Sequence, residues 1–226
     1  GQEVGLNFSY KIQKIQRGIS DAYFIAEDFL DGASSVLALS DNVFLGKNFF
    51  NYAEEALSKM KQEGGSIFGL PVPDPEKYGV IELDQNDNII GIEEKPLQPK
   101  SNLITPGMYF FDSSACEHVK TLKPSARGEL EITDLIEIYL SQNKLALQRL
   151  DENIIWHDTG NADALLTAAQ KVKRYEMENG IKVGSYEIAS YEKGFINKEA
   201  LLKIAEKFIK SDYGQYIKNI YLKDKN

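Results

Sequence analysis

The chain has 226 residues, of which 42% are hydrophobic, and this length allows one substantial core with a smaller appended unit. Its longest apolar stretches, such as 34–39 and 67–72, are far shorter than the roughly 20 residues of a membrane-spanning helix. The formal net charge of −8 argues against non-specific binding to nucleic acid or to an anionic membrane. We therefore predict a soluble protein without nucleic-acid or membrane partners.

The single cysteine, Cys116, cannot form an internal disulfide and fits a reducing, cytoplasmic compartment. The chain starts at Gly1, and no cationic segment followed by an apolar one opens it, so we predict no secretory signal.

The first third of the chain alternates between predicted strands and helices. Residues 6–12 alternate apolar and polar side chains as a half-buried strand does. A helix is predicted over 22–29, and the apolar run 35–39 predicts a strand buried on both faces. A second helix over 48–61 precedes a second apolar strand over 67–72. This alternation favours a mainly parallel sheet covered on both faces.

The middle of the chain favours a hairpin, because 79–83 and 89–94 flank the turn-forming run 84–88. We therefore predict a mixed sheet. The remaining predicted elements are a strand at 108–111, helices at 114–122 and 131–140, strands at 146–150 and 154–156, a charged helix at 162–179, an extended piece near 181–188, and helices at 197–209 and 213–221. We predict an α/β core over 1–165 and a mostly helical C-terminal region over 166–226.

Two aspartates, Asp41 and Asp158, each follow an apolar strand-like run. Ligands of α/β sheets collect beyond the carboxyl ends of strands, and magnesium bound to phosphate takes one or two protein carboxylates. A metal site is therefore one interpretation. Position alone favours the simpler alternative that both aspartates cap turns or helices.

Two charged clusters have equally open local interpretations. In 91–96 a strand delivers Glu94 and Lys95 before a proline, and such a pair could bind a sugar hydroxyl and a phosphate. Composition alone favours a solvated strand end with an ordinary ion pair. Arg127 precedes an acidic-led helix and could fork onto a phosphate.

Several other chemistries do not fit. The only histidines, His118 and His157, form no zinc-site pattern with Cys116. The 226 residues contain neither a G-x-x-x-x-G-K-[ST] phosphate loop nor a G-x-G-x-x-G or G-x-S-x-G sequence.

Taken in chain order, these runs resemble the sugar nucleotidyltransferases, most closely the glucose-1-phosphate thymidylyltransferases. The matching pieces are Gln13 with 17–22, 39–46, 78–80, 93–96 continuing through 99–102, 107–109, 125–134, 156–160, 193–196 and 213–216. The closing Tyr213-Gly214-Gln215-Tyr216 favours thymidylyl over uridylyl and adenylyl relatives. The resemblance implies a three-layer Rossmann-like nucleotidyltransferase fold and assembly as a homotetramer.

The resemblance also implies a reaction and a set of site residues. A phosphate oxygen of glucose 1-phosphate would attack the α-phosphorus of dTTP in line, and pyrophosphate would leave. The implied residues are Asp41 and Asp158 as Mg²⁺ ligands, Gln13 and Gly18 at the thymine base, Gly79, Glu94, Lys95 and Tyr109 at the sugar phosphate, and Arg127 as a phosphate contact. Asp41, Asp158, Lys95 and Arg127 would be the catalytic groups among them.

The family begins with a strand leading to a G-G-x-G-T-R-L loop, and nothing in the 226 residues matches it. We therefore expect a sheet with an unpaired edge and little transferase activity from this polypeptide alone. The chain also departs from the family at Thr105-Pro106 and at Asp21, where thymidylyl enzymes often have glutamine. Base and sugar selectivity are therefore open. The alternatives are a uridylyltransferase acting on UTP and glucose 1-phosphate, and a non-catalytic module that binds sugar phosphate and nucleotide.

Overall fold

The computed structural model describes residues 1–223, with side chains described through residue 220. Contacts divide the chain into two units: Lys11–Ala168, and Gly1–Tyr10 together with the chain from Ala169 onward. The sequence-based division lay between 165 and 166 and kept the first ten residues with the core, whereas here those ten residues join the C-terminal unit. Within residues 1–223, no helix combines the length and the apolar character needed to cross a bilayer.

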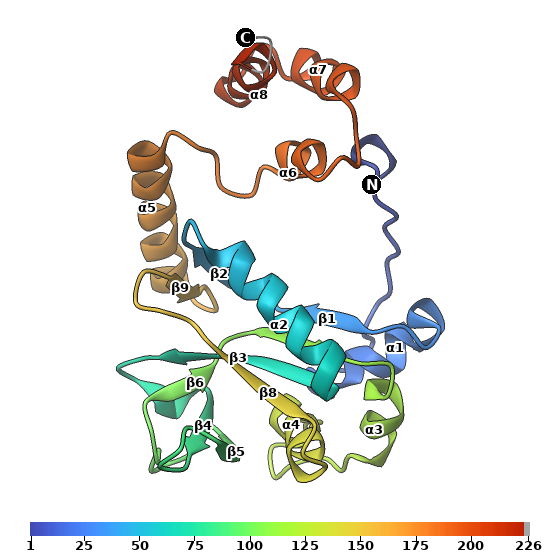
Figure 1. The fold of residues 1–226 in the computed structure, drawn as a ribbon, viewed down its shortest axis with the longest axis vertical. Helices are drawn as coiled ribbons and strands as arrows, with labels where there is room; N and C mark the ends of the chain where they lie inside the picture. The colour runs from blue at the N-terminus through green and yellow to red at the C-terminus, as the bar shows by residue number, and fades with distance from the viewer. Residues whose placement is uncertain (224–226) are drawn as a thin grey trace. The chain divides into compact units, whose positions relative to one another are not determined.

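The larger unit, residues 11–168, contains an α/β core (Figure 1). Its helical elements are α1 (Asp21–Leu30), α2 (Phe49–Glu63), η2 (Pro75–Lys77), α3 (Ala115–Thr121), α4 (Ile132–Ser141) and the beginning of α5 (Ala162–Asn179). Its strands are β1 (Ser35–Ala38), β2 (Asn42–Leu45), β3 (Gly65–Pro71), β4 (Gly79–Leu83), β5 (Ile89–Glu94), β6 (Leu103–Thr105), β7 (Met108–Phe111), β8 (Leu145–Arg149) and β9 (Ile155–Asp158).

The main sheet has the strand order β1-β7-β3-β6-β4-β5, with β8 also paired to β3. A separate two-stranded sheet joins β2 to β9. The main sheet is mixed, as predicted. Among the described residues only the β3–β8 pair is parallel, so antiparallel pairing dominates, and the prediction that the sheet is mainly parallel is wrong. The reason is that β4–β5 form a hairpin and that β6 and β7 run against β3.

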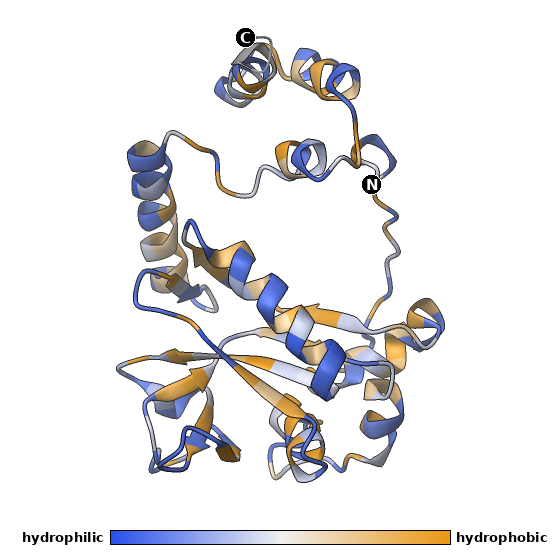
Figure 2. Cartoon of the chain, viewed as in Figure 1, coloured by the Kyte–Doolittle hydropathy of each residue, from blue (hydrophilic) through white to orange (hydrophobic). Residues whose placement is uncertain are grey.

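Helices cover both faces of the main sheet, which gives the predicted three layers. On one face, α1, α3 and α4 pack against Ile67, Ile81 and Phe111. On the other face, α2 packs against Phe68 and Phe110. Neighbouring residues in β3 and in β7 therefore serve opposite cores, as the period of two along a strand requires. Figure 2 shows the same segregation, with apolar strands and helices that carry one apolar side.

Most of the predicted elements are confirmed, including the helices α1, α2, α3, α4 and α5 and the hairpin β4–β5. The strand predicted at 6–12 is wrong, because no described residues pair with it, and Tyr10 is 86% exposed. An isolated extended segment cannot satisfy its backbone polar groups as a sheet does. The run 35–39 does form a strand, but β1 is an edge strand with Val36 46% exposed rather than a strand buried on both faces.

The smaller unit is helical. It contains η1 (Gln2–Val4), the rest of α5, α6 (Tyr186–Glu192), α7 (Lys198–Lys207) and α8 (Asp212–Lys223). Its core includes Val4, Ile188, Leu201 and Ile217. The extended piece predicted at 181–188 is partly wrong, because α6 begins within it. In α8, Gly214 lies so close to the Phe208 carbonyl that a Cβ would not fit there.

Candidate active site

Asp41 and Asp158 lie side by side, although they are far apart in the sequence. The antiparallel β2–β9 pair places Asn42 directly opposite Asp158, and Asp41 immediately precedes Asn42. The backbone N–H and the hydroxyl of Thr159 both donate to the Asp41 carbonyl oxygen at 2.8 Å. These bonds lie at the end of the β2–β9 pair and keep Asp41 and Asp158 next to each other there.

The two aspartates fit the oxygen-donor chemistry that magnesium requires. In each, Oδ1 accepts one local hydrogen bond, from the Asn42 amide at 2.8 Å in Asp41 and from the Gly160 N–H at 2.8 Å in Asp158. The described residues contain no group of three or more metal-binding side chains. Two carboxylates suffice for magnesium, which keeps several waters and takes its remaining ligands from substrate phosphate.

Two aromatic side chains pack beside Asn42 at this end of the small sheet. The Trp156 indole N–H donates to Asn42 Oδ1 at 2.7 Å, and the ring of Tyr78 packs edge-on against Trp156 at 5.0 Å between centroids. Burial raises the pKa of Tyr78, and the negative charge of Asp158 raises it further. The sequence alone predicts no role for Asn42, Trp156 or Tyr78. The signal that could have identified them is that each lies in a run that matches the family, 39–46, 156–160 or 78–80.

Gly79 and Glu94 occupy one row of the hairpin, where they face each other across β4 and β5. On its other side Gly79 is paired with Thr105 of β6. A Cβ at Gly79 would lie 3.5 Å from Glu94 Oε2, so the missing side chain leaves the carboxylate adjoining the strand backbone. Lys95 follows with a positive φ of 45°, and its N–H donates to the Tyr78 carbonyl at 3.0 Å. This turn ends the strand with the lysine exposed.

Glu94 lies in a cluster of charged groups. Burial raises its pKa, and the nearby Glu131 carboxylate raises it further, whereas Lys95 and Arg127 lower it. Arg127 lies 3.6 Å from Glu94, 3.0 Å from Glu129 and 3.8 Å from Glu131. The arginine is therefore surrounded by carboxylates, with which a bound phosphate would compete for the guanidinium.

Tyr109, which the sequence predicts at the sugar phosphate, senses the charges of both Glu94 and Asp41. Its ring is buried in the core between β1 and β3, where it is paired with Leu37 and Ile67. Burial raises the pKa of its hydroxyl, and the charges of Glu94 and then Asp41 add to this effect. Tyr109 is thus within electrostatic reach of both clusters, and it stays a neutral phenol near neutral pH.

Gln13 and Gly18, the residues predicted to contact the base, lie close together. The Gln13 amide donates to the Gly18 carbonyl at 3.2 Å and to the buried Asp21 carboxylate at 2.9 Å. Arg17 also binds Asp21, at 2.6 Å. Gly18 has a positive φ of 101°, and a Cβ there would lie 2.5 Å from the Leu130 carbonyl oxygen, so only glycine fits this close approach.

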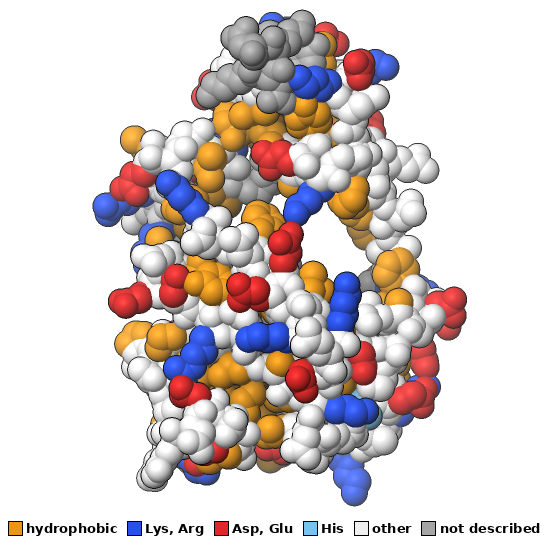
Figure 3. Space-filling view, in the orientation of Figure 1, with side chains coloured by type: hydrophobic (Ala, Val, Ile, Leu, Met, Phe, Trp, Pro, Cys, Tyr) orange, Lys and Arg blue, Asp and Glu red, His pale blue; other side chains and the backbone are white. Residues whose placement is uncertain are grey.

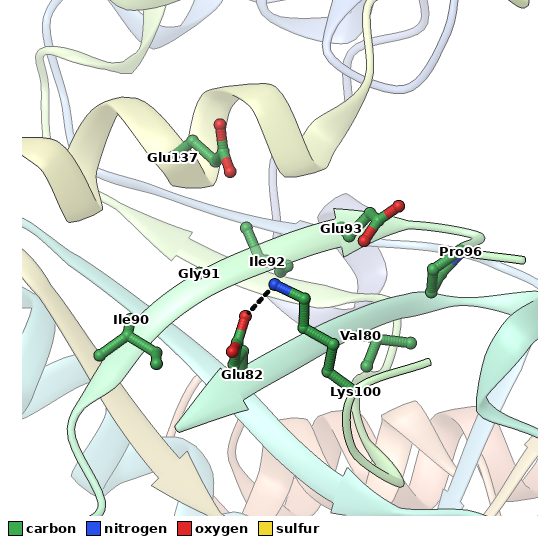
Figure 4. Close-up of a pocket in the computed structure, with 9 residues that line it drawn as sticks. All are labelled: Val80, Glu82, Ile90, Gly91, Ile92, Glu93, Pro96, Lys100 and Glu137. Carbon is green, nitrogen blue, oxygen red and sulfur yellow. Dashed lines mark hydrogen bonds and ion pairs between the residues drawn. The ribbon is translucent and has the colours of Figure 1, made fainter. Parts of the chain in front are cut away.

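A separate cavity of about 350 Å³ opens between the hairpin and α4 (Figure 4). Its charged lining consists of Glu82, Glu93, Glu137 and Lys100, and the lysine is ion-paired with Glu82 at 2.6 Å. None of the predicted site residues lines it. Carboxylates outnumber the one paired cation, so this cavity disfavours a phosphate. Acidic and basic side chains are also interspersed on the face of the molecule shown in Figure 3. The electrostatic potential at the candidate active site therefore depends mainly on the charged groups nearest to it.

Comparison with known proteins decides the family of the chain. Residues 1–175 match the nucleotidyl transferase family. A glucose-1-phosphate thymidylyltransferase of Xanthomonas campestris is 39% identical over 96% of this chain and 73% of its own length. The chain belongs to the nucleotidyl transferase family.

Two further comparisons agree with this family. The glucose-1-phosphate thymidylyltransferase of Neisseria gonorrhoeae is 38% identical to this nucleotidyl transferase over 96% of the chain and 75% of its own length. A crystal structure from Bacillus anthracis, described as a candidate glucose-1-phosphate thymidylyltransferase in complex with sucrose, superposes with a TM-score of 0.68 at 35% identity. That match covers 82% of this chain and 71% of the other.

Proposed function

We propose that this chain binds dTTP and glucose 1-phosphate for thymidylyl transfer, a reaction that yields dTDP-glucose and pyrophosphate. The names of its relatives support the substrates. The observation that carries the proposal is the pairing of β2 with β9, which sets Asp41 beside Asp158. One or two protein carboxylates are what a magnesium ion bound to phosphates takes from its protein, and the two neighbouring residues at the end of this sheet can offer them.

The chain's own residues would bind and align the two substrates. Lys95 is exposed beside Glu94, so its ammonium can reach a sugar phosphate while the carboxylate accepts a hexose hydroxyl. The Arg127 guanidinium would exchange a carboxylate partner for phosphate oxygen. No general base is needed, because the attacking phosphate oxygen is already ionised near neutral pH. Alignment and charge neutralisation would supply the rate enhancement.

The proposed divalent ion is Mg²⁺, held by Asp41 and Asp158. When bound, Mg²⁺ would offset the repulsion between two anionic substrates. The residues that hold it are acidic, so without the ion this edge would repel a triphosphate. The homotetramer implied by the resemblance stays a prediction, which sedimentation velocity would measure.

Binding of the product tests the proposal directly. The 226 residues contain no G-G-x-G-T-R-L sequence, so little turnover is expected and binding is measured first. Calorimetric titration uses dTDP-glucose, UDP-glucose and glucose 1-phosphate, and a pyrophosphate-release assay follows. We expect dTDP-glucose to bind at least about tenfold more tightly than UDP-glucose, because the two differ by the thymine methyl and by the 2′-hydroxyl of the ribose. Tighter binding of UDP-glucose would favour a uridylyltransferase. Binding of neither nucleotide sugar would reject the proposal.

A lysine pair provides the matched control for the sugar-phosphate residues. Lys95→Ala should weaken glucose 1-phosphate binding, because it removes a cation beside Glu94. Lys100→Ala removes another exposed lysine, which is ion-paired with Glu82 in the neighbouring cavity, so it should leave the affinity unchanged. Equal effects of the two variants would mean that only the overall charge matters, and would reject the role of Lys95.

A further inference from the structure

The side-chain amide of Gln13 uses both of its N–H donors within the protein. Its Nε2 group donates to the Gly18 carbonyl oxygen at 3.2 Å and to Asp21 Oδ2 at 2.9 Å. An amide nitrogen carries two N–H donors, so these two bonds occupy it fully. Among the described residues the amide oxygen Oε1 has no hydrogen-bond partner, and the side chain is exposed. The oxygen is therefore the polar atom that Gln13 offers to a ligand.

Asp21 imposes this orientation on the amide. Its carboxylate is only 2% exposed, and its Oδ1 is ion-paired with Arg17 at 2.6 Å. An ionised carboxylate accepts hydrogen bonds and donates none. If the Gln13 amide turned over, Oε1 would face the Asp21 carboxylate and the Gly18 carbonyl without a proton between any of these oxygens. Asp21 therefore excludes the reversed amide.

Backbone contacts fix the loop that carries the orienting carboxylate. The Leu130 N–H donates to the Arg17 carbonyl at 2.6 Å, and the Ser20 N–H donates to the Leu130 carbonyl at 3.3 Å. The fully buried Ser20 hydroxyl donates to the Glu131 carbonyl at 2.9 Å. Because Gly18 also approaches Leu130 closely, the loop has little freedom relative to the start of α4. The carboxylate that orients the amide is thus held in place itself.

We propose that Asp21 is a positioning residue through which the site at Gln13 selects bases with an N–H at N3, uracil and thymine, over cytosine. This inference rests on the proposed function, because it takes a nucleobase to be the ligand of Gln13. Uracil and thymine carry a donor at N3, and Oε1 accepts from it. Cytosine carries a lone pair at N3, and two acceptors that face each other repel. Asp21 acts on the base only through the amide, because Arg17 and Gln13 occupy its two oxygens.

The aspartate itself is what fixes the preference. Glutamine, which thymidylyl enzymes often have at this position, carries both a donor and an acceptor, so it imposes no single orientation on a neighbouring amide. Asp21 does not distinguish thymine from uracil, because both carry the same N–H at N3. The choice between dTTP and UTP therefore depends on other contacts, whereas the rejection of cytosine depends on Asp21.

The experiment titrates UDP-glucose and CDP-glucose calorimetrically into the wild type and its variants. These two ligands share the ribose, the pyrophosphate and the glucose, so the ratio of their affinities reports on the base alone. We expect the wild type to prefer UDP-glucose at least about tenfold. Asp21→Asn should reduce this ratio at least about threefold, because the asparagine N–H allows the Gln13 amide to turn over.

Two further variants separate positioning from a general structural effect. Arg17→Gln removes the ion pair of Asp21 and leaves its hydrogen bond to Gln13, so it should lower the melting temperature and keep the wild-type ratio. Gln13→Ala changes an exposed side chain, so it should leave the melting temperature unchanged and erase the preference. In the Gln13→Ala background, Asp21→Asn should not change the ratio further.

The outcomes distinguish this inference from the proposed function. If the wild type binds UDP-glucose and CDP-glucose equally, if Gln13→Ala or Asp21→Asn keeps the wild-type ratio, or if Arg17→Gln lowers it as far, the inference is wrong while the proposed function stands. If the ratio depends on Asp21 but dTDP-glucose does not bind, the proposed substrate is wrong while the role of Asp21 stands. Absence of binding of all three nucleotide sugars would overturn both.

Discussion

Gly79→Ala tests how tightly the row Thr105–Gly79–Glu94 is packed. The added methyl would lie 2.9 Å from Thr133 Cγ2 and 3.1 Å from Thr105 Cγ2, both closer than an ordinary carbon contact. Thr133 and Thr105 are buried, and their β-branched side chains are stiff about χ1. Neither can swing aside as the end of a long side chain would. The first turn of α4 must therefore shift away from the hairpin.

The magnitude follows from the cost of overpacking a core. One methyl inserted into a well-packed site typically costs about 1–3 kcal/mol. In a unit of the size of residues 11–168, each kcal/mol lowers the melting temperature by about 2–4 °C. We therefore expect Gly79→Ala to melt about 2–12 °C below the wild type. Glucose 1-phosphate binding should weaken as well, because a shift of α4 moves Thr133, whose side chain is hydrogen-bonded to the Glu94 carboxylate.

The assay is differential scanning calorimetry, with Gly91→Ala as the control. Gly91 also lies in the hairpin, but a Cβ there would come no closer than 3.6 Å to any neighbour, the Glu82 carboxylate. The control should therefore melt close to the wild type. If Gly79→Ala melts at the same temperature as Gly91→Ala, the row is not packed against α4 as described, and the reasoning is refuted.

Three other predictions address the metal, the buried carboxyl and the helical unit. Asp41→Asn and Asp158→Asn should each lower Mg²⁺ affinity at least about tenfold, measured by calorimetry with dTDP-glucose present. Their circular dichroism should match the wild type. Undiminished affinity in either variant would show that its residue is not a metal ligand. Burial and a neighbouring carboxylate raise the pKa of Glu94, so the folded state binds the proton of this carboxyl more tightly than the unfolded state does. The free energy of unfolding therefore falls as the pH rises from the usual glutamate range to the raised pKa. Glu94→Gln should lose that slope in thermal melts from about pH 4 to about pH 7, and a slope equal to that of the wild type would contradict the assignment. Tyr213 donates a hydrogen bond to Glu187, which is 3% exposed, so Tyr213→Phe should cost about 1–3 kcal/mol in urea unfolding, and an unchanged midpoint would show that the carboxylate is satisfied without it.

The sequence predicted the elements whose signals are local. The helices α2 and α4 follow from apolar residues at helical spacing, and the β4–β5 hairpin follows from a turn-forming run between two apolar segments. Such signals depend on residues a few positions apart, so they survive in a single sequence. The three-residue strand β6 lacks any such signal, and it was missed.

The candidate site shows where local signals end. Taken by position alone, Asp41 and Asp158 were better explained as caps, and only the family motifs around them indicated a metal site. The pairing of β2 with β9 makes them neighbours, and β2 was not predicted. The row that contains Thr105 was equally invisible, because it requires the register of three strands at once. A register specifies which side chains face each other, and one strand's own pattern does not contain it.

The sequence by itself therefore determined the α/β class, most helices, the hairpin and, through its ordered motifs, the family. Only the tertiary structure decided that 35–39 is an exposed edge, that 6–12 is not a strand, and that Thr105 shares a row with Glu94. The physical reason is the same in each case. Helices and turns close their hydrogen bonds within a few residues, whereas a strand acquires its burial and its neighbours from partners that lie far away in the chain.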